Sequence, residues 1–176
     1  MCKVEPIQMP LLKIVSGGQT GVDRGALDAA LAVRFPCGGW CPADRSAEDG
    51  PIPERYPLTP LPVGGCRLRT RRNVSDSDGT AILFYDMLSN GTLLTRDLCI
   101  REKKPCVVLD AKQISAPAAA AAILRFVDEH QIQVLNVAGP RSSGWAQGYA
   151  FALGVVGEVM LRRRESESSV APSSVP

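Results

Sequence analysis

The stretch Leu11-Leu12-Lys13-Ile14-Val15-Ser16-Gly17-Gly18-Gln19-Thr20-Gly21 decides how this chain folds. Its first five residues form a short apolar run of the length of a buried strand. An amphipathic segment, Val22 to Arg34, follows the glycines and has apolar residues at helical spacing. The order strand, glycine turn, helix is therefore the first prediction.

Two interpretations fit the turn at residues 16–21. Glycine lets the backbone approach a ligand, and the first amides of a helix point outward at its positive end, so the turn suits a phosphate. The spacing matches neither the dinucleotide fingerprint nor the P-loop, because position 19 is Gln and no Gly-Lys-Ser/Thr follows. The other interpretation is a tight connection without a ligand. Asp23 is expected to accept a cap amide or to pair with Arg24.

The alternation of strand and helix continues along the chain. Further extended segments are predicted at 38–41, 80–85, 106–109 and 133–138, and helices at 67–73, 90–103, 116–129 and 145–161. This order predicts an α/β fold, with a mostly parallel sheet and helices on both faces. Residues 1–161 are expected to form one domain and residues 162–176 a flexible tail. The proline-rich loop 42–62 is either functional or disordered.

Polar residues follow several predicted strands, where α/β sheets bind their ligands. Asn90-Gly91-Thr92 comes after the strand 80–85, and Gly139 to Gly144 comes after the strand 133–138. Two glycine turns at one sheet edge suit a phosphorylated ligand, although Asn90-Gly91-Thr92 also reads as an ordinary helix start. The arginines at 67, 69, 71 and 72 form either a solvated helix face or a surface that turns Arg67 and Arg71 toward an anion.

Composition excludes several classes of protein. The formal net charge of +2 indicates no large surface for nucleic acid, and no apolar run is long enough to span a membrane. Six cysteines and one histidine lack the paired spacing of a zinc site, so no metal-ligating residues are assigned. A cytoplasmic location with reduced thiols is expected.

Five ordered motifs resemble the molybdenum carrier family, the molybdenum cofactor carriers. They are residues 16–24, 38–42, 47–57, 67–80 and 135–141, within a similarity that spans about residues 11 to 155. The family is a branch of the Rossmann-type clan that includes the lysine-decarboxylase-like proteins and the phosphoribohydrolases. The resemblance implies a Rossmann-like doubly wound fold. It also implies binding of molybdenum cofactor (molybdopterin), a pterin with a terminal phosphate and a dithiolene-bound molybdenum, for protection and transfer.

The resemblance and the strand-end argument together assign the ligand-binding residues. They are Gly17, Gly18, Gln19, Thr20, Gly21, Arg24, Arg67, Asp78, Asn90, Gly91, Thr92, Gly139, Arg141 and Ser142. No catalytic residue is assigned. The expected partners are a phosphorylated pterin, molybdoenzymes as recipients and further copies of the chain in a homo-oligomer, a dimer or a tetramer.

One departure from the clan concerns catalysis. The phosphoribohydrolases carry Pro-Gly-Gly-x-Gly-Thr-x-x-Glu, and the corresponding stretch here is Leu88 to Thr95, with Thr95 in the place of the glutamate. Threonine cannot act as a carboxylate base. The sequence therefore favours a carrier, with a nucleotide-binding protein or a nucleoside-monophosphate phosphoribohydrolase-like enzyme as the alternative.

Overall fold

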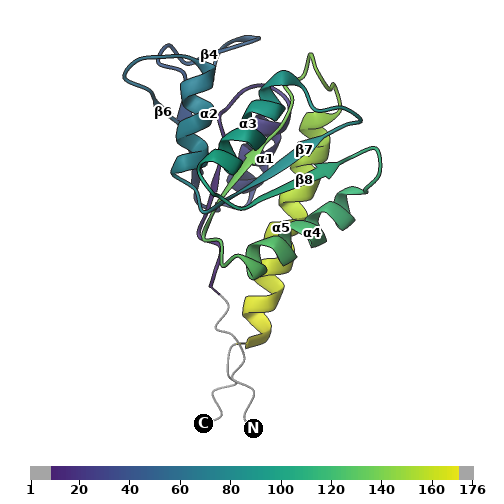
Figure 1. The fold of residues 1–176 in the computed structure, drawn as a ribbon. Coiled ribbons are helices and arrows are strands. Elements are labelled where there is room, and N and C mark those ends of the chain that lie inside the picture. Colours follow the sequence, from purple (N-terminus) through teal and green to yellow (C-terminus); the bar gives the residue numbers. More distant parts are fainter. Residues whose placement is uncertain (1–8, 171–176) are drawn as a thin grey trace.

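The structure is a computed structural model that describes residues 9–170 (Figure 1). Its strands are β1 (Lys13–Val15), β2 (Cys37–Gly38), β3 (Trp40–Cys41), β4 (Ser46–Ala47), β5 (Gly50–Pro51), β6 (Thr59–Pro60), β7 (Gly79–Phe84), β8 (Cys106–Asp110) and β9 (Val134–Ala138). Its helices are α1 (Val22–Ala32), α2 (Cys66–Ser75), α3 (Asn90–Arg101), α4 (Ala116–Glu129) and α5 (Gly148–Val170).

The central sheet has five strands in the order β2-β1-β9-β7-β8, and every pair in it is parallel. Leu135 of β9 lies opposite Ile14 of β1 on one side and Gly79 of β7 on the other. If the strands are numbered from β9 onward, through β1, β2, β7 and β8, the same sheet reads 3-2-1-4-5. That is the order of a doubly wound Rossmann sheet, entered here at its second strand.

Helices cover both faces of this sheet, as predicted. α1, α4 and α5 pack on one face, and α2 and α3 pack against each other on the other face. The main core lies under α1, α4 and α5 and includes Ile14, Leu135 and Ile123. A smaller cluster under α2 and α3 contains Val74, Leu98 and Cys99. The parallel α/β architecture is thus confirmed.

The loop 42–62 is not an open, structureless segment. Its residues Ile52, Tyr56 and Leu58 form a second core cluster with Leu27 of α1. The Tyr56 hydroxyl donates a hydrogen bond of 3.0 Å to Asp28, another residue of α1. β4 and β5 pair as a short antiparallel hairpin at residues 46–51, which we call the 46–51 hairpin. Local packing therefore holds this loop on α1, next to the strand ends.

The last helix differs from the prediction at both ends. It begins at Gly148 rather than Trp145, because residues 141–145 form a turn closed by the Gly144 and Trp145 amides on the Arg141 carbonyl. It continues to Val170, past the predicted boundary at residue 161. Arg162 pairs with Glu158 one turn earlier, so the basic end of the segment extends the helix. The rest of the predicted tail, 171–176, lies outside the described residues.

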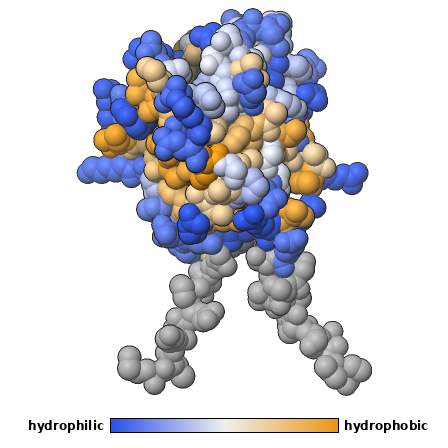
Figure 2. Space-filling model, turned by 90° about the vertical axis from the view of Figure 1, so that its right-hand side faces the viewer, coloured by the Kyte–Doolittle hydropathy of each residue, from blue (hydrophilic) through white to orange (hydrophobic). Residues whose placement is uncertain are grey.

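The helices of the structure test the prediction that no segment of the chain spans a membrane. None of them, the 23-residue α5 included, is both long and apolar enough to cross a membrane. Figure 2 shows apolar side chains gathered in the middle of the face that lies on the right in Figure 1, with hydrophilic residues around them.

Candidate functional site

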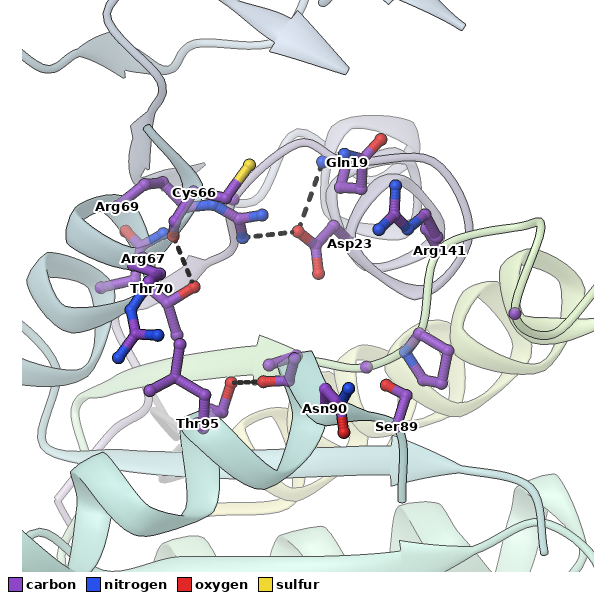
Figure 3. A pocket seen from close by; sticks show the side chains of 18 of the residues that line it. Gln19, Asp23, Cys66, Arg67, Arg69, Thr70, Ser89, Asn90, Thr95 and Arg141 are labelled. Atoms are coloured by element: carbon purple, nitrogen blue, oxygen red, sulfur yellow. Dashed lines mark hydrogen bonds and ion pairs between the residues drawn. The ribbon is translucent and has the colours of Figure 1, made fainter. Parts of the chain in front are cut away.

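A cavity of about 460 Å³ opens at the carboxyl ends of β1, β7 and β9. Figure 3 shows side chains converging on it from four directions. Gln19 and Asp23 follow β1, Ser89 and Asn90 follow β7, Arg141 follows β9, and Arg67 and Arg69 come from α2. β9 lies between β1 and β7, and the chain leaves these two strands in opposite directions across the sheet. The cavity therefore lies at the switch point where doubly wound sheets bind ligands.

Helix α2 forms one wall of the cavity through residues spaced three and four apart. Cys66, Arg69, Thr70 and Asn73 line it, with Arg67 beside them. Arg71 does not lie in the cavity. Its side chain is 65% exposed and pairs with Glu102 at 3.2 Å. The expectation that Arg67 and Arg71 share a face toward the ligand is therefore wrong for Arg71, because the inward face of α2 runs through position 69.

A buried ion pair joins α1 to α2 at the cavity. Arg69 Nη1 donates to Asp23 Oδ2 at 2.9 Å, and both side chains are largely buried. The Arg69 guanidinium fills the space beside Gly17, where an added Cβ would lie 1.7 Å from Nη1. Burial raises the pKa of the Asp23 carboxyl, and Arg69, the Gln19 amide and the Ser16 hydroxyl only partly offset this. Gly17 thus makes room for Arg69.

The turn at residues 16–21 uses its amides within the protein. The Gln19 amide donates to Asp23 Oδ2 at 3.3 Å, and the Thr20 amide donates to the Gln19 side-chain oxygen at 3.0 Å. Gly18, with a φ of +76°, faces Leu58, so it lies away from the cavity. The internal partners favour the tight-connection interpretation of this turn over phosphate binding.

The 46–51 hairpin fastens this turn to the loop after β9. Glu48 accepts hydrogen bonds from the Thr20 hydroxyl and from the Ser143 amide and hydroxyl, the last at 2.6 Å. Its carboxylate lies 3.8 Å from Arg141 Nε. Burial alone would raise the pKa of the Glu48 carboxyl, but the bonds from Ser143 and Thr20 and the Arg141 charge hold it below its usual value. Glu48 therefore holds the loop that carries Arg141.

Four further predicted residues contact the loops that form the cavity but do not line it. Arg24 forms a paired contact with Asp49 of the hairpin, at 2.6 and 2.8 Å, rather than with Asp23. Gly21, with a φ of +78°, packs on the loop after β9. The Ser142 amide donates to Thr20 Oγ1 at 3.1 Å. These residues, with Thr20, shape the cavity without lining it.

The start of α3 presents a different arrangement. Asn90 and Gly91 line the cavity, and no side chain caps the amides of this helix. The hydroxyl of Ser89, the N-cap residue, lies 2.7 Å from that of Thr92, which is buried behind the cavity. Thr95 lines the cavity and donates its hydroxyl to the Gly91 carbonyl at 3.1 Å. An uncapped helix start carries partial positive charge, so this end suits an anion.

Asp78 is a correction to the predicted site. It precedes β7, so it lies at the amino end of that strand, the edge of the sheet opposite the cavity. Its carboxylate accepts the amides of Gln133 and Val134 at 3.0 and 2.8 Å. Asp78 therefore connects the starts of β7 and β9 and cannot reach a ligand in this cavity.

The structure brings half of the predicted residues together. Gly17, Gln19, Arg67, Asn90, Gly91, Gly139 and Arg141 line the cavity, whereas Gly18, Thr20, Gly21, Arg24, Thr92, Ser142 and Asp78 do not. The prediction missed Asp23, Arg69 and Asn73 as lining residues. The helical spacing of positions 66, 69, 70 and 73 was the available signal for α2. Within the described part of the chain, no group of three or more His, Cys, Asp or Glu side chains could hold a metal ion.

Comparison with protein families decides the relationship. The model of the circularly permutated YpsA SLOG family matches residues 14–160. The chain belongs to this family. The strand order becomes the Rossmann order 3-2-1-4-5 only when it is counted from β9, the last strand of the described chain. This is the order expected of a circularly permuted Rossmann sheet.

A solved structure supports the resemblance to the molybdenum carriers. The crystal structure of a protein named "Putative molybdenum carrier protein", from Syntrophus aciditrophicus SB, superposes on the chain with a TM-score of 0.83. The two sequences are 42% identical over 85% of this chain and 95% of the other. The resemblance found from the motifs is thereby confirmed. No curated protein matches the chain.

Proposed function

We propose that this protein carries molybdenum cofactor and binds its phosphorylated pterin in the cavity at the carboxyl ends of β1, β7 and β9. The observation that carries the proposal is the charge of the cavity. Three arginines, 67, 69 and 141, line it, and Asp23 is the one carboxylate among the described lining residues. Asp23 pairs with Arg69, and Glu48, outside the lining, lies 3.8 Å from Arg141 Nε, so the arginines still outnumber the carboxylates beside them. A net positive cavity at a switch point suits a phosphorylated ligand. The name of the similar solved protein supports a molybdenum-related ligand.

The phosphate binds between α3 and two arginines in this proposal. The uncapped amides at Asn90 and Gly91 supply the helix end, and Arg67 and Arg141 lie on opposite sides of the cavity (Figure 3). The guanidinium of arginine makes paired, charge-assisted hydrogen bonds to phosphate oxygens. Gly139 lines the cavity after β9, and its missing Cβ makes room for the Leu83 carbonyl and Val22. The molybdenum and its dithiolene are the cargo, which this protein shields and passes to molybdoenzymes.

The hydrolase alternative needs a carboxylate that can act as a catalytic base in the cavity, but the carboxylates in and beside the cavity are bound to other residues. Thr95 lines the cavity in the position of the clan's glutamate, and its hydroxyl already donates to the Gly91 carbonyl. Asp23 is held by Arg69, and Glu48 is held by Thr20 and Ser143 outside the lining. Nucleotides remain a second class of ligand, because they also carry a phosphate. The helix end and the arginines would recognise the phosphate of a nucleotide as well as that of a pterin.

A paired measurement tests the proposed function. The purified protein is titrated with isolated molybdenum cofactor by calorimetry, and it is also incubated with adenosine and guanosine monophosphates. We expect saturable binding of the cofactor and no free base above background. Base release at roughly 1 per second or faster, the scale of an ordinary enzyme, would place the hydrolase first. Absence of cofactor binding overturns the carrier.

Self-association is a further part of the proposal. The apolar area in Figure 2 lies on the face that is on the right in Figure 1, whereas α2 lies on the left there. Such an area is suited to contact with another copy of the chain. We infer a homo-oligomer, a dimer or a tetramer, that leaves each cavity open to its ligand.

A further inference from the structure

Asp23 is the one acidic residue among the described residues that line the cavity. It belongs to α1, and only 3% of its surface is exposed. One carboxylate oxygen, Oδ2, accepts Arg69 Nη1 at 2.9 Å and the Gln19 amide at 3.3 Å. Figure 3 shows the other oxygen directed into the open space of the cavity. A phosphate carrier gains nothing from a carboxylate there, because the two charges repel each other.

The surroundings of Asp23 fix its position. Arg69 reaches it through the gap that Gly17 leaves, where a Cβ on residue 17 would collide with the guanidinium. Arg69 Nε is buried without a hydrogen-bond partner, which makes the pairing of Nη1 with Asp23 a main polar anchor of this side chain. A buried carboxylate held by an arginine keeps its charge more readily than an isolated one. The cavity thus contains a fixed acceptor at the end opposite α3.

We propose that Asp23 binds the N–H donors of the ligand's ring and selects a heterocycle with a cyclic guanidine edge. Such an edge carries an amino group next to a ring N–H, as in pterin and guanine. An ionised carboxylate only accepts hydrogen bonds, and its free oxygen offers two lone pairs to this edge. Adenine is a poorer match, because a ring acceptor lies next to its amino group. This inference rests on the proposed function and adds to it the residue that recognises the ring.

The two ends of the cavity then orient the ligand. The phosphate lies toward the start of α3, where Figure 3 shows Asn90 across the cavity from Asp23, and Arg67 and Arg141 reach it from the two sides. The ring lies toward Asp23 and Arg69. Repulsion between Asp23 and the phosphate disfavours the reversed orientation. Hydrogen bonds to a charged acceptor contribute about 1.5–3 kcal/mol, which corresponds to roughly ten- to a hundredfold in affinity.

The test uses two ligands that differ only in the amino group. The parent protein is titrated with a pterin that carries a phosphorylated side chain and with its 2-deamino analogue. We expect the parent to bind the amino form at least about tenfold more tightly. Asp23→Asn should bind both forms with similar affinity, because its side-chain amide presents donors to the amino group. Asp97→Asn, a change on α3 outside the cavity lining, should keep the parent's preference.

Each outcome decides one of the two proposals. A parent that binds both forms equally overturns the inference, and this result needs no variant to fold. An Asp23→Asn protein that melts like the parent and keeps the full preference overturns it too, as does an equal loss of affinity for both forms. A parent that binds neither form overturns the proposed function itself.

Discussion

Replacing Gly21 with alanine should destabilise the protein by about 3 kcal/mol or more. Gly21 has φ +78° and ψ −130°, a backbone conformation that L residues rarely adopt. An added Cβ would also lie 2.6 Å from the Pro140 carbonyl oxygen and 2.9 Å from the Ser142 nitrogen. Both neighbours are backbone atoms, so neither can move aside as a flexible side chain would. For a domain of this size we expect a melting temperature lower by roughly 6–12 °C.

Gly157→Ala is the matched control for this change. Gly157 lies inside α5, and no atom lies within 4 Å of its added Cβ. Alanine in a helix interior is more favourable than glycine by roughly 0.5–1 kcal/mol, so this variant should melt at or above the parent's temperature. Thermal unfolding followed by circular dichroism measures both. If Gly21→Ala melts like the parent, the close contact between the first turn and the loop after β9 is wrong.

Loss of Arg67 or Arg141 should weaken cofactor binding by about ten- to a hundredfold each. Each guanidinium supplies charge-assisted hydrogen bonds to the phosphate in the proposed complex. Both side chains are exposed at the cavity, so truncation to alanine should leave the melting temperature nearly unchanged. The two losses need not add, because the arginines share one ligand group. Calorimetric titration of Arg67→Ala, Arg141→Ala and the double variant measures the effect.

Arg71→Ala provides the control on the same helix. Arg71 is the same residue type as Arg67 and is also exposed, but it pairs with Glu102 outside the cavity. Its removal should change the affinity for the cofactor little, apart from a small effect that salt screens. Parent-like binding by both cavity variants would place the phosphate elsewhere. A loss in Arg141→Ala alone would leave Arg67 as a surface residue and the loop after β9 as the main contact.

The sequence predicted the elements well, because hydrophobic periodicity is a local property. β7 and α4 lie within one residue of their predicted bounds, since an apolar run such as Ala81 to Phe84 and an alanine-rich helix need no distant information. The end of α5 was less predictable. Ion pairs with Glu158 and Asp128 hold the basic residues Arg162 and Arg163 in the helix, and the partner in α4 is remote in sequence.

The site was only partly predictable, because its key contacts join distant segments. Asp23 and Arg69 are 46 positions apart, and nothing near either residue indicates the partner. The turn at 16–21 looked suited to phosphate because its glycines are visible in the sequence. The residues that pack against these glycines, Leu58 and Pro140, cannot be recognised from the sequence. Asp78 directly precedes the strand predicted at 80–85, so its position at the amino end of β7 could have been inferred from the sequence, but its place in a matching motif outweighed this in the prediction.

Mass spectrometry of the ligand that co-purifies with the protein tests the central claim most directly. The protein and its Arg67→Ala/Arg141→Ala double variant are produced in a molybdate-replete host, and the small molecules released on denaturation are identified. We expect a phosphorylated pterin from the parent and little or none from the double variant, with both proteins melting alike. A nucleotide in place of the pterin, or equal amounts of pterin from both proteins, would contradict the account.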